Sequence, residues 1–512
     1  MKTHFIGITL LCLLFLSCSS DDKINETIIN HPSTTQSPEI NSFALNLVTA
    51  SNKKTKQVAS ICNESKIIEW TTLSWIENLD ALSFEIEAEG QLYIGDHILD
   101  QGSTIDFSKR EIKCKLVGEK NVEVEYSLIL NCPQTSGLPV VSISTEDGID
   151  ISTQSKSKDY VKCDIELKDK NHPKYNFNVR GGVRGRGNST WGLPKKPMRI
   201  KLDEKRSVLG LPKEKSWVLL ANYLDPTYLM NSVAFELAKR MNLEFTNTDY
   251  HVELFYNGKY WGNYQLTEQV QVKSNRIVVD KKEGYLVELD SYFDDEFKFR
   301  TTEYQLPVMV KYPEVKSDAE MNFIRKDFEV LENIMLSEDF STTDLSPYVD
   351  IEALAKYMMV FEMTGNTELE HPKSVKLYKK DKDSPMSFGP VWDFDWAYGK
   401  QPQKGKFTYF ENPQNLILVR GNNSTLGYRF FTRFFENKEF LKTYKSLFLE
   451  FKEKGVFNMD EFIENKVIEL QYSAALDHSL WKDRPSFKGQ IELMKEWLLK
   501  HQDAVSFQVN NY

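Results

Sequence analysis

The sequence GGVRGRGNSTW at Gly181–Trp191, followed by KKPMRIKL at Lys195–Leu202, joins a glycine-rich turn to a strand pattern. Alternation in the second part predicts a strand with apolar side chains on one face and Arg199 and Lys201 on the other. Glycines let backbone N–H groups approach an anion, and cations supply donors to phosphate. The stretch therefore predicts a phosphate-binding loop, and its alternative is a tight turn beside a solvated strand face.

Strand patterns surround this stretch, and helical patterns follow them. Strands dominate from 140 to 310, and apolar residues at helical spacing take over from about 316 to the end. Short helices are predicted at Ala234–Met241, Ile351–Met363 and Ile491–Ala504. The predicted class is α+β, with a strand-rich first half and a helical second half.

The part of the chain before residue 137 reads as a separate β module. Alternating segments lie between polar turns at Asn41–Leu47, Leu82–Ala88 and Val122–Leu128. Several short strands at such spacing are typical of a small antiparallel sandwich, and the pattern resembles Ig-like modules. We predict an Ig-like β-sandwich over 41–136, and a larger domain over 139–505 after the linker Gly137-Leu138-Pro139.

The first residues predict export. Lys2 precedes an apolar run at Phe5–Leu16 that is too short to cross a membrane, as in a secretory signal peptide over 1–17. Cys18 follows a small residue where a lipobox cysteine would stand, and residues 18–40 have the composition of a flexible tether. We expect a protein of the cell envelope, lipid-anchored at an outer membrane with a periplasmic or surface-exposed face. The alternative is a soluble secreted protein.

The composition of the chain makes a nucleic-acid partner and a membrane-spanning helix less plausible. The chain has 512 residues and a net charge of −10, which argues against a nucleic-acid partner. No later apolar run approaches twenty residues, so the only expected membrane attachment is the lipid. Disulfides can form in an exported chain, but the remaining cysteines lack the spacing of metal ligands: Cys62, Cys114, Cys132 and Cys163.

A second polar cluster, FGPVWDFDWAYG at Phe388–Gly399, places Asp393 and Asp395 among aromatic side chains. Carboxylates near apolar surface need a cation or hydrogen bonds. Oxygen ligands of this kind suit Mg²⁺ that bridges phosphates. The alternative is that both carboxylates cap turns or pair with the arginines of residues 181–202.

These clusters belong to an ordered series of short motifs. The series reads RGNSTW at 186–191, KPMRIKL at 196–202, ANYLD at 221–225, LTE at 266–268, GYLVELD at 284–290 and WDFDW at 392–396. In this order it resembles the spore coat protein H (CotH) family of atypical kinases, over roughly 139–505. The resemblance implies a diverged protein-kinase-like core that binds ATP with Mg²⁺. It also implies transfer of the γ-phosphoryl group to Ser or Thr of exported or surface proteins.

The resemblance also implies roles for residues. Arg199 and Lys201 would face the phosphates, Asp393 would hold Mg²⁺ with Asp395 close behind, and Glu268 could pair with a cation. The implied nucleotide-binding residues are Arg186, Asn188, Arg199, Lys201, Glu268 and Glu288. The implied catalytic residues are Asp393, Asp395 and Glu368, and the implied metal ligands are Asp393 and Ser374.

The sequence departs from the family pattern at three places. Glu368 stands where the family has a catalytic aspartate, and Ser374 stands where it has a metal-binding asparagine. Met230 replaces an arginine that often precedes Asn231. A carboxylate and an oxygen ligand are kept, but at altered reach. Two other functions therefore stay open: a pseudokinase that binds ligands without turnover, and a surface lipoprotein that binds protein or glycan.

Overall fold

The computed structural model describes residues 37–48, 54–72, 76, 79–100, 102–132, 136–399, 412–419, 424–482 and 485–512. The predicted signal peptide 1–17, the lipidation site Cys18 and the predicted tether up to residue 36 lie outside the described residues. Among the helices of the described part, none is long and apolar enough to cross a membrane.

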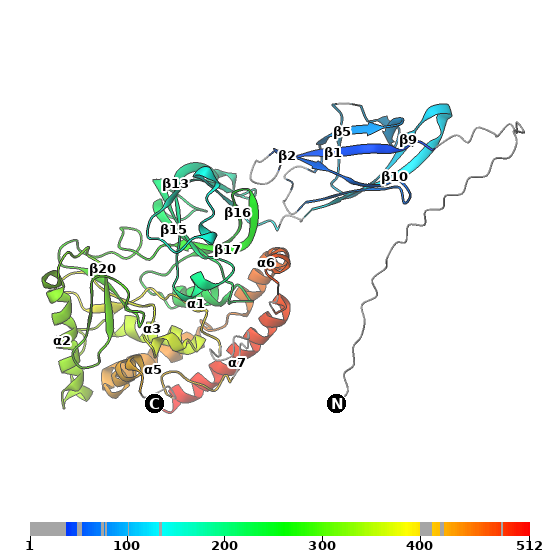
Figure 1. Cartoon of the computed structure of the whole chain (residues 1–512). Helices are drawn as coiled ribbons and strands as arrows, with labels where there is room; N and C mark the ends of the chain where they lie inside the picture. The colour runs from blue at the N-terminus through cyan, green and yellow to red at the C-terminus, as the bar shows by residue number, and fades with distance from the viewer. Residues whose placement is uncertain are drawn as a thin grey trace, which may run out of the picture.

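Two described sheets lie before residue 132 (Figure 1). One has the strand order β2-β1-β5-β8 and the other β3-β4-β10-β9-β6-β7. The bounds are β1 Ile40–Val48, β2 Lys54–Val58, β3 Ser60–Cys62, β4 Ile67–Thr71, β5 Leu82–Ala88, β6 Gln91–Ile94, β7 His97–Ile98, β8 Thr104–Ile105, β9 Glu111–Val117 and β10 Glu123–Asn131. Trp70 is fully buried against Phe43 and Phe107, with ring centroids 4.8 and 5.6 Å away. The four cysteines of the described chain are free thiols, so it contains no disulfide.

The next strands close into a barrel in the order β11-β12-β13-β14-β15-β17-β16. Their bounds are β11 Val140–Thr145, β12 Val161–Lys168, β13 Phe177–Gly185, β14 Met198–Arg206, β15 Glu214–Leu220, β16 Asp249–Tyr256 and β17 Lys259–Glu268. A parallel pairing of β11 with β16 closes the ring. In β14 the apolar residues Met198, Ile200 and Leu202 are buried in the barrel core. The alternation predicted for this strand is confirmed, since Arg199 is only partly buried and Lys201 is exposed.

A smaller sheet, called here the small sheet, has the order β19-β20-β18-β21-β22. Its strands are β18 Tyr285–Leu289, β19 Lys298–Arg300, β20 Pro307–Tyr312, β21 Val375–Lys379 and β22 Met386–Phe388. The last two come from the half of the chain predicted to be helical. They pair with β18, so the small sheet joins both halves in one core.

Helices fill most of the second half. They are α1 Met230–Arg240, α2 Asn322–Leu336, α3 Ile351–Thr364, α4 Leu426–Arg433, α5 Lys438–Glu453, α6 Asp460–Leu480 and α7 Phe487–Asn510. The central α3 contacts α1, α5 and α7 (Figure 1). Asp350 caps its first turn through Ala353 N at 3.0 Å, and Gly365 ends it with φ of 58°. The α+β class, strand-rich first and helical second, is therefore observed.

Candidate functional site

A cavity of about 920 Å³ lies between the outer face of the barrel and the small sheet. The barrel side contributes Arg184, Arg186, Asn188 and Arg199, and the small sheet contributes Glu288, Lys311 and Lys376. Segments around the small sheet add Asp290, Glu368, Ser374, Asp393 and Asp395. Residues far apart in the sequence thus meet on one polar surface.

Most of the residues implied by the family resemblance line this cavity, namely Arg186, Asn188, Arg199, Glu288, Glu368, Ser374, Asp393 and Asp395. Lys201 and Glu268 do not belong to the cavity lining. The Lys201 ammonium lies on the outer barrel face, 6.0 Å from the Tyr160 ring. Glu268 is buried and accepts a hydrogen bond from Thr248 N at 2.8 Å. The structure therefore brings the two clusters together but places these two side chains elsewhere.

Asp393 is held by its neighbours from several sides. Its backbone has φ of 69°, a left-handed conformation that a non-glycine residue adopts only when it is supported. Asn366 Nδ2 donates to Asp393 O, and Asn231 Oδ1 accepts from Phe394 N, each at 3.0 Å. Ser374 Oγ donates to Asp393 Oδ2 at 3.2 Å. The two asparagines bond one peptide group and so fix the position from which the carboxylate projects.

Glu368 is a buried acid beside this carboxylate. Its backbone N–H donates to Asn366 Oδ1 at 3.0 Å, which positions the short helical turn Thr367–Leu369. Its Oε2 atom is buried and has no hydrogen-bond partner in the described chain. Burial, then the charges of Asp393 and Asp395, raise the pKa of Glu368 well above its ordinary value. Burial and these charges therefore favour the protonated form of Glu368, whereas the charge of Lys373 opposes them.

The arginines of the barrel form the opposite, cationic wall. Arg184 and Arg199 stand directly opposite each other on β13 and β14, and the Nε atom of each is buried without a partner in the described chain. Burial lowers the pKa of Arg199, and Arg184 lowers it further. The Arg186 guanidinium lies 5.5 Å from the Trp392 ring, and burial lowers its pKa although Asp393 raises it. Like charges this close favour an anionic ligand.

Glu288 on β18 forms two ion pairs at the cavity. Its carboxylate forms ion pairs with Lys376 and, at 2.7 Å, with Lys311. Burial alone would raise the pKa of Glu288, but the two lysines lower it to about 2. Burial and the Glu288 charge raise the pKa of Asp290 to about 6. The sequence motif indicated Glu288, whereas Lys311 and Lys376 stand outside every motif and were missed.

The oxygen atoms around Asp393 fit a divalent cation that is shared with a phosphate ligand. Among the described residues, no group of three His, Cys, Asp or Glu side chains is placed to hold a metal alone. Mg²⁺ commonly takes one or two protein oxygens and completes its shell with phosphates and water. Asp393 and Ser374 offer such oxygens, and the Glu368 Oε2 atom lacks a partner.

Fold and site together define an α+β protein in whose cleft arginines lie across from the carboxyl groups of Glu368 and Asp393. The sequence profile of the family described as CotH kinase protein matches residues 183–504. The chain therefore belongs to the CotH kinase family, which implies ATP and a divalent metal.

Other comparisons add little. None of the curated proteins matches the chain. Among solved structures, a DUF4623 family protein from Bacteroides eggerthii DSM 20697 matches with 13% identity and a TM-score of 0.15. The match covers 35% of this chain and 49% of that chain, so this chain spans about half the length of that protein.

Proposed function

We propose that this protein is a membrane-anchored CotH-type protein kinase with a diverged kinase-like core. It would transfer the γ-phosphoryl group of ATP to Ser or Thr of exported proteins. The observation that carries the proposal is the opposition, across one cavity, of Arg184, Arg186 and Arg199 to Asp393 and Glu368. Phosphoryl transfer needs positioning and charge compensation more than covalent help, and this arrangement supplies both.

The arginines would bind the phosphates of ATP. Each guanidinium offers several donors to phosphate oxygens, and the buried Nε atoms of Arg184 and Arg199 have no other acceptor. Asp393 and Ser374 would hold Mg²⁺ on the other side. Bound Mg²⁺ would compensate the charge of the phosphate oxygens and lower the pKa of nearby carboxyl groups.

Glu368 would act as the base. The acceptor hydroxyl oxygen forms a bond to the γ-phosphorus while the bond to the bridging β,γ oxygen breaks, and ADP leaves. The hydroxyl proton passes to the Glu368 carboxylate. Burial, and then the charges of Asp393 and Asp395, raise the pKa of Glu368, so a bound cation would favour its deprotonated form.

The location of the protein is a second part of the proposal. Cys18 would carry the lipid, and the signal peptide and tether would place the mature chain at the outer membrane. ATP is scarce outside the cytoplasm, so the kinase would depend on a supply of nucleotide there. Labelling of cells with a fatty acid analogue should mark the wild-type protein and not Cys18→Ser. Equal labelling of both would refute lipidation at Cys18.

The kinase proposal is tested by phosphate transfer. The purified full chain is incubated with Mg²⁺ and γ-labelled ATP, with exported proteins as acceptors. Incorporation should fall at least about 100-fold in Asp393→Ala, because an essential charge is removed. Asp503→Ala, an exposed position on α7, serves as the matched control. No incorporation above the Asp393→Ala level would refute the proposal.

A pseudokinase is the second candidate, and one observation favours it. Glu368 stands where the family has a catalytic aspartate, and burial, followed by the charges of Asp393 and Asp395, raises its pKa, which disfavours the deprotonated base. In that case ATP would bind in the presence of Mg²⁺ without turnover. Measured turnover that depends on Glu368 would exclude this candidate.

A further inference from the structure

The outer face of the barrel next to the cavity is strongly cationic. Register places Lys162 on β12 opposite Gly182 on β13, and Gly182 opposite Lys201 on β14. Arg184 and Arg199 form the next outward-facing pair on β13 and β14, two residues away from Gly182 and Lys201. Alternation puts both rows on the side of the sheet that faces away from the barrel core. We call the side chains of Lys162, Arg184, Arg199 and Lys201 the basic face.

These charges lack carboxylate partners. Within the described chain, none of the four side chains of the basic face forms an ion pair within 4.0 Å. The nearby carboxylate of Asp164 pairs instead with Arg180, at 3.2 Å. This contrasts with a whole chain of net charge −10. The basic face therefore carries the opposite charge to that of the chain as a whole.

The cations are also held in place. Tyr160 packs on Gly182, where an added Cβ would lie 2.8 Å from the Tyr160 Cβ. The Arg184 guanidinium lies 5.1 Å and the Lys201 ammonium 6.0 Å from the centre of the same ring. Cations over an aromatic ring lose part of their freedom before any ligand arrives. The surface is thus partly organised in advance.

The basic face continues into the cavity. Arg184 and Arg199 belong to both surfaces, and Lys156 and Lys158 stand on the cavity lining near them. Lys156 donates to Gly187 O at 2.7 Å and to Asn188 Oδ1 at 2.8 Å, both neutral oxygens, and forms no ion pair within the described residues. A ligand that crosses the basic face would thus lead directly to the residues around Asp393.

We propose that the basic face docks an acidic, extended segment of the protein acceptor. Arg199 and Lys201 lie two residues apart on β14, about 6.6 Å along the strand, which is also the spacing of side chains on one side of an extended peptide, and the exposed Asp203 ends this cationic stretch. Carboxylates at alternate positions of such a segment would match both cations when no ATP is bound, and Lys162 and Lys201 stay available when ATP occupies Arg199. This inference rests on the proposed kinase function for its purpose, but the binding itself does not require ATP.

The test is fluorescence anisotropy with the full chain and a labelled peptide in which glutamates alternate around a central serine. A peptide of equal length with lysines in place of the glutamates, and a single-stranded DNA of similar charge, are compared. The acidic peptide should bind tightest, and its affinity should fall as salt rises. Lys162→Glu, a position outside the cavity lining, should weaken binding about tenfold because it replaces attraction by repulsion.

Controls separate docking from other effects. Lys259→Glu reverses an exposed charge elsewhere on the barrel and should leave peptide affinity unchanged. ATP affinity should be unchanged in Lys162→Glu, and circular dichroism should match that of the wild type. In transfer assays, Lys162→Glu should raise KM for the acidic peptide and leave kcat unchanged.

The outcomes are distinguishable. The inference is overturned if the wild type does not bind the acidic peptide, if Lys162→Glu binds it as tightly as the wild type, or if the DNA binds more tightly. Peptide binding without any ATP binding would support docking and refute the kinase. If phosphate transfer to the acidic peptide occurred with the same KM in Lys162→Glu and in the wild type, the kinase proposal would be supported and docking would be refuted.

Discussion

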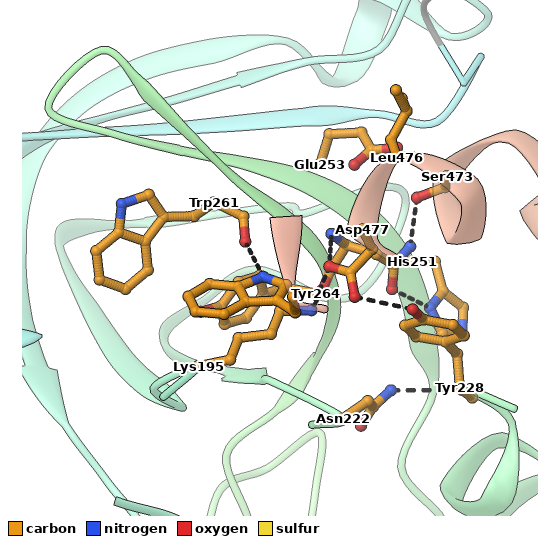
Figure 2. A network of polar contacts seen from close by, with 12 residues as sticks. Lys195, Asn222, Tyr228, His251, Glu253, Trp261, Tyr264, Ser473, Leu476 and Asp477 are labelled. Carbon is orange, nitrogen blue, oxygen red and sulfur yellow. Dashed lines mark hydrogen bonds and ion pairs between the residues drawn. The ribbon is translucent and has the colours of Figure 1, made fainter. Parts of the chain in front are cut away.

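Two buried charge clusters in this chain are built from the same kinds of side chain but differ in how completely they are hydrogen-bonded. The first centres on Asp477 of α6 (Figure 2). Its Oδ1 accepts from Lys195 Nζ at 2.6 Å and from Asn263 N at 2.9 Å, and its Oδ2 accepts from Tyr228 OH at 2.8 Å. Asp477 and Lys195 are both fully buried.

The Asp477 cluster extends into a network that fastens α6 to the barrel. Asn263 Nδ2 donates to Ser473 Oγ at 2.8 Å, and Asn263 Oδ1 lies 3.0 Å from His251 Nδ1 (Figure 2). Gly262 makes room for the helix, since a Cβ there would lie 2.1 Å from Asp477 Oδ1. The carboxylate of Asp477 is thus satisfied by the protein itself.

The charged residues of the cavity, called here the open cluster, are less completely hydrogen-bonded. Within the described chain, buried Nε atoms of Arg184 and Arg199 and the Oε2 atom of Glu368 have no partner. An unsatisfied buried polar group costs on the order of 1–3 kcal/mol, which a ligand that bonds to these atoms would recover. The closed network around Asp477 fastens α6 to the barrel, whereas the open cluster offers unsatisfied groups to the proposed ligand.

The largest expected effect breaks the closed network. Asp477→Ala leaves the Lys195 ammonium buried and unpaired, which should lower the free energy of unfolding by about 3–5 kcal/mol. Urea unfolding of the full chain measures this. Asp503→Ala, on the exposed side of α7, is the matched control and should change little. Similar curves for the two variants would contradict a structural role for the network.

Glu288 gives the next effect, through pH. Its folded pKa of about 2 lies below the ordinary value of 4.5, so its stabilisation is present above pH 4.5 and is lost as pH falls towards 2. The full contribution is about 3 kcal/mol. Glu288→Gln should remove most of this acid dependence and lower stability at pH 7. An unchanged acid dependence of unfolding in this variant would show that the ion pairs contribute nothing.

The pH dependence of stability that Asp290 causes has the opposite sign to that of Glu288 and is slightly smaller. Its folded pKa of about 6 lies above the ordinary value of 3.8, so stability falls as pH rises from about 4 to 6. Asp290→Asn should therefore gain about 2–3 kcal/mol at pH 7 and nothing at pH 3. Asp344→Asn, an exposed position, controls for the substitution itself. Equal stability of wild type and Asp290→Asn at pH 7 would contradict the raised pKa.

Ser374 gives the smallest effect. Ser374→Ala removes the hydrogen bond to Asp393 Oδ2 and one oxygen ligand, so Mg²⁺-dependent ATP affinity should fall about tenfold. Ser374→Asn restores the residue that the family carries and should bind at least as tightly as the wild type. Ser157→Ala, also on the cavity lining, is the control. Equal affinity of the Ser374→Ala and wild-type proteins would remove Ser374 from the metal site.

Local sequence patterns predicted individual elements well. The strand Leu82–Ala88 is observed as β5 with the predicted bounds, and the helix Ile351–Met363 is observed as α3. Both depend on side-chain periods of two or 3.6 residues, which a short window of sequence displays. The family resemblance implied Asp393 and Ser374 as metal ligands, and the two side chains are hydrogen-bonded.

Long-range pairing could not be predicted in this way. The strands β21 and β22 lie in the half of the chain predicted to be helical. They could not be predicted because they are short apolar segments without clear alternation. Nothing in the sequence around Lys376 indicates that it pairs with Glu288, or that Lys195 pairs with Asp477. Such pairs arise from the topology of the barrel and the small sheet, which bring distant segments together.

We propose that the open cluster binds ATP with a divalent cation through Asp393. Calorimetric titration of the full chain with ATP, with and without Mg²⁺, tests it most directly. We predict micromolar binding that requires Mg²⁺ in the wild type and is at least about tenfold weaker in Asp393→Ala. Absence of ATP binding to the wild type, or equal Mg²⁺-dependent binding by Asp393→Ala, would contradict the account.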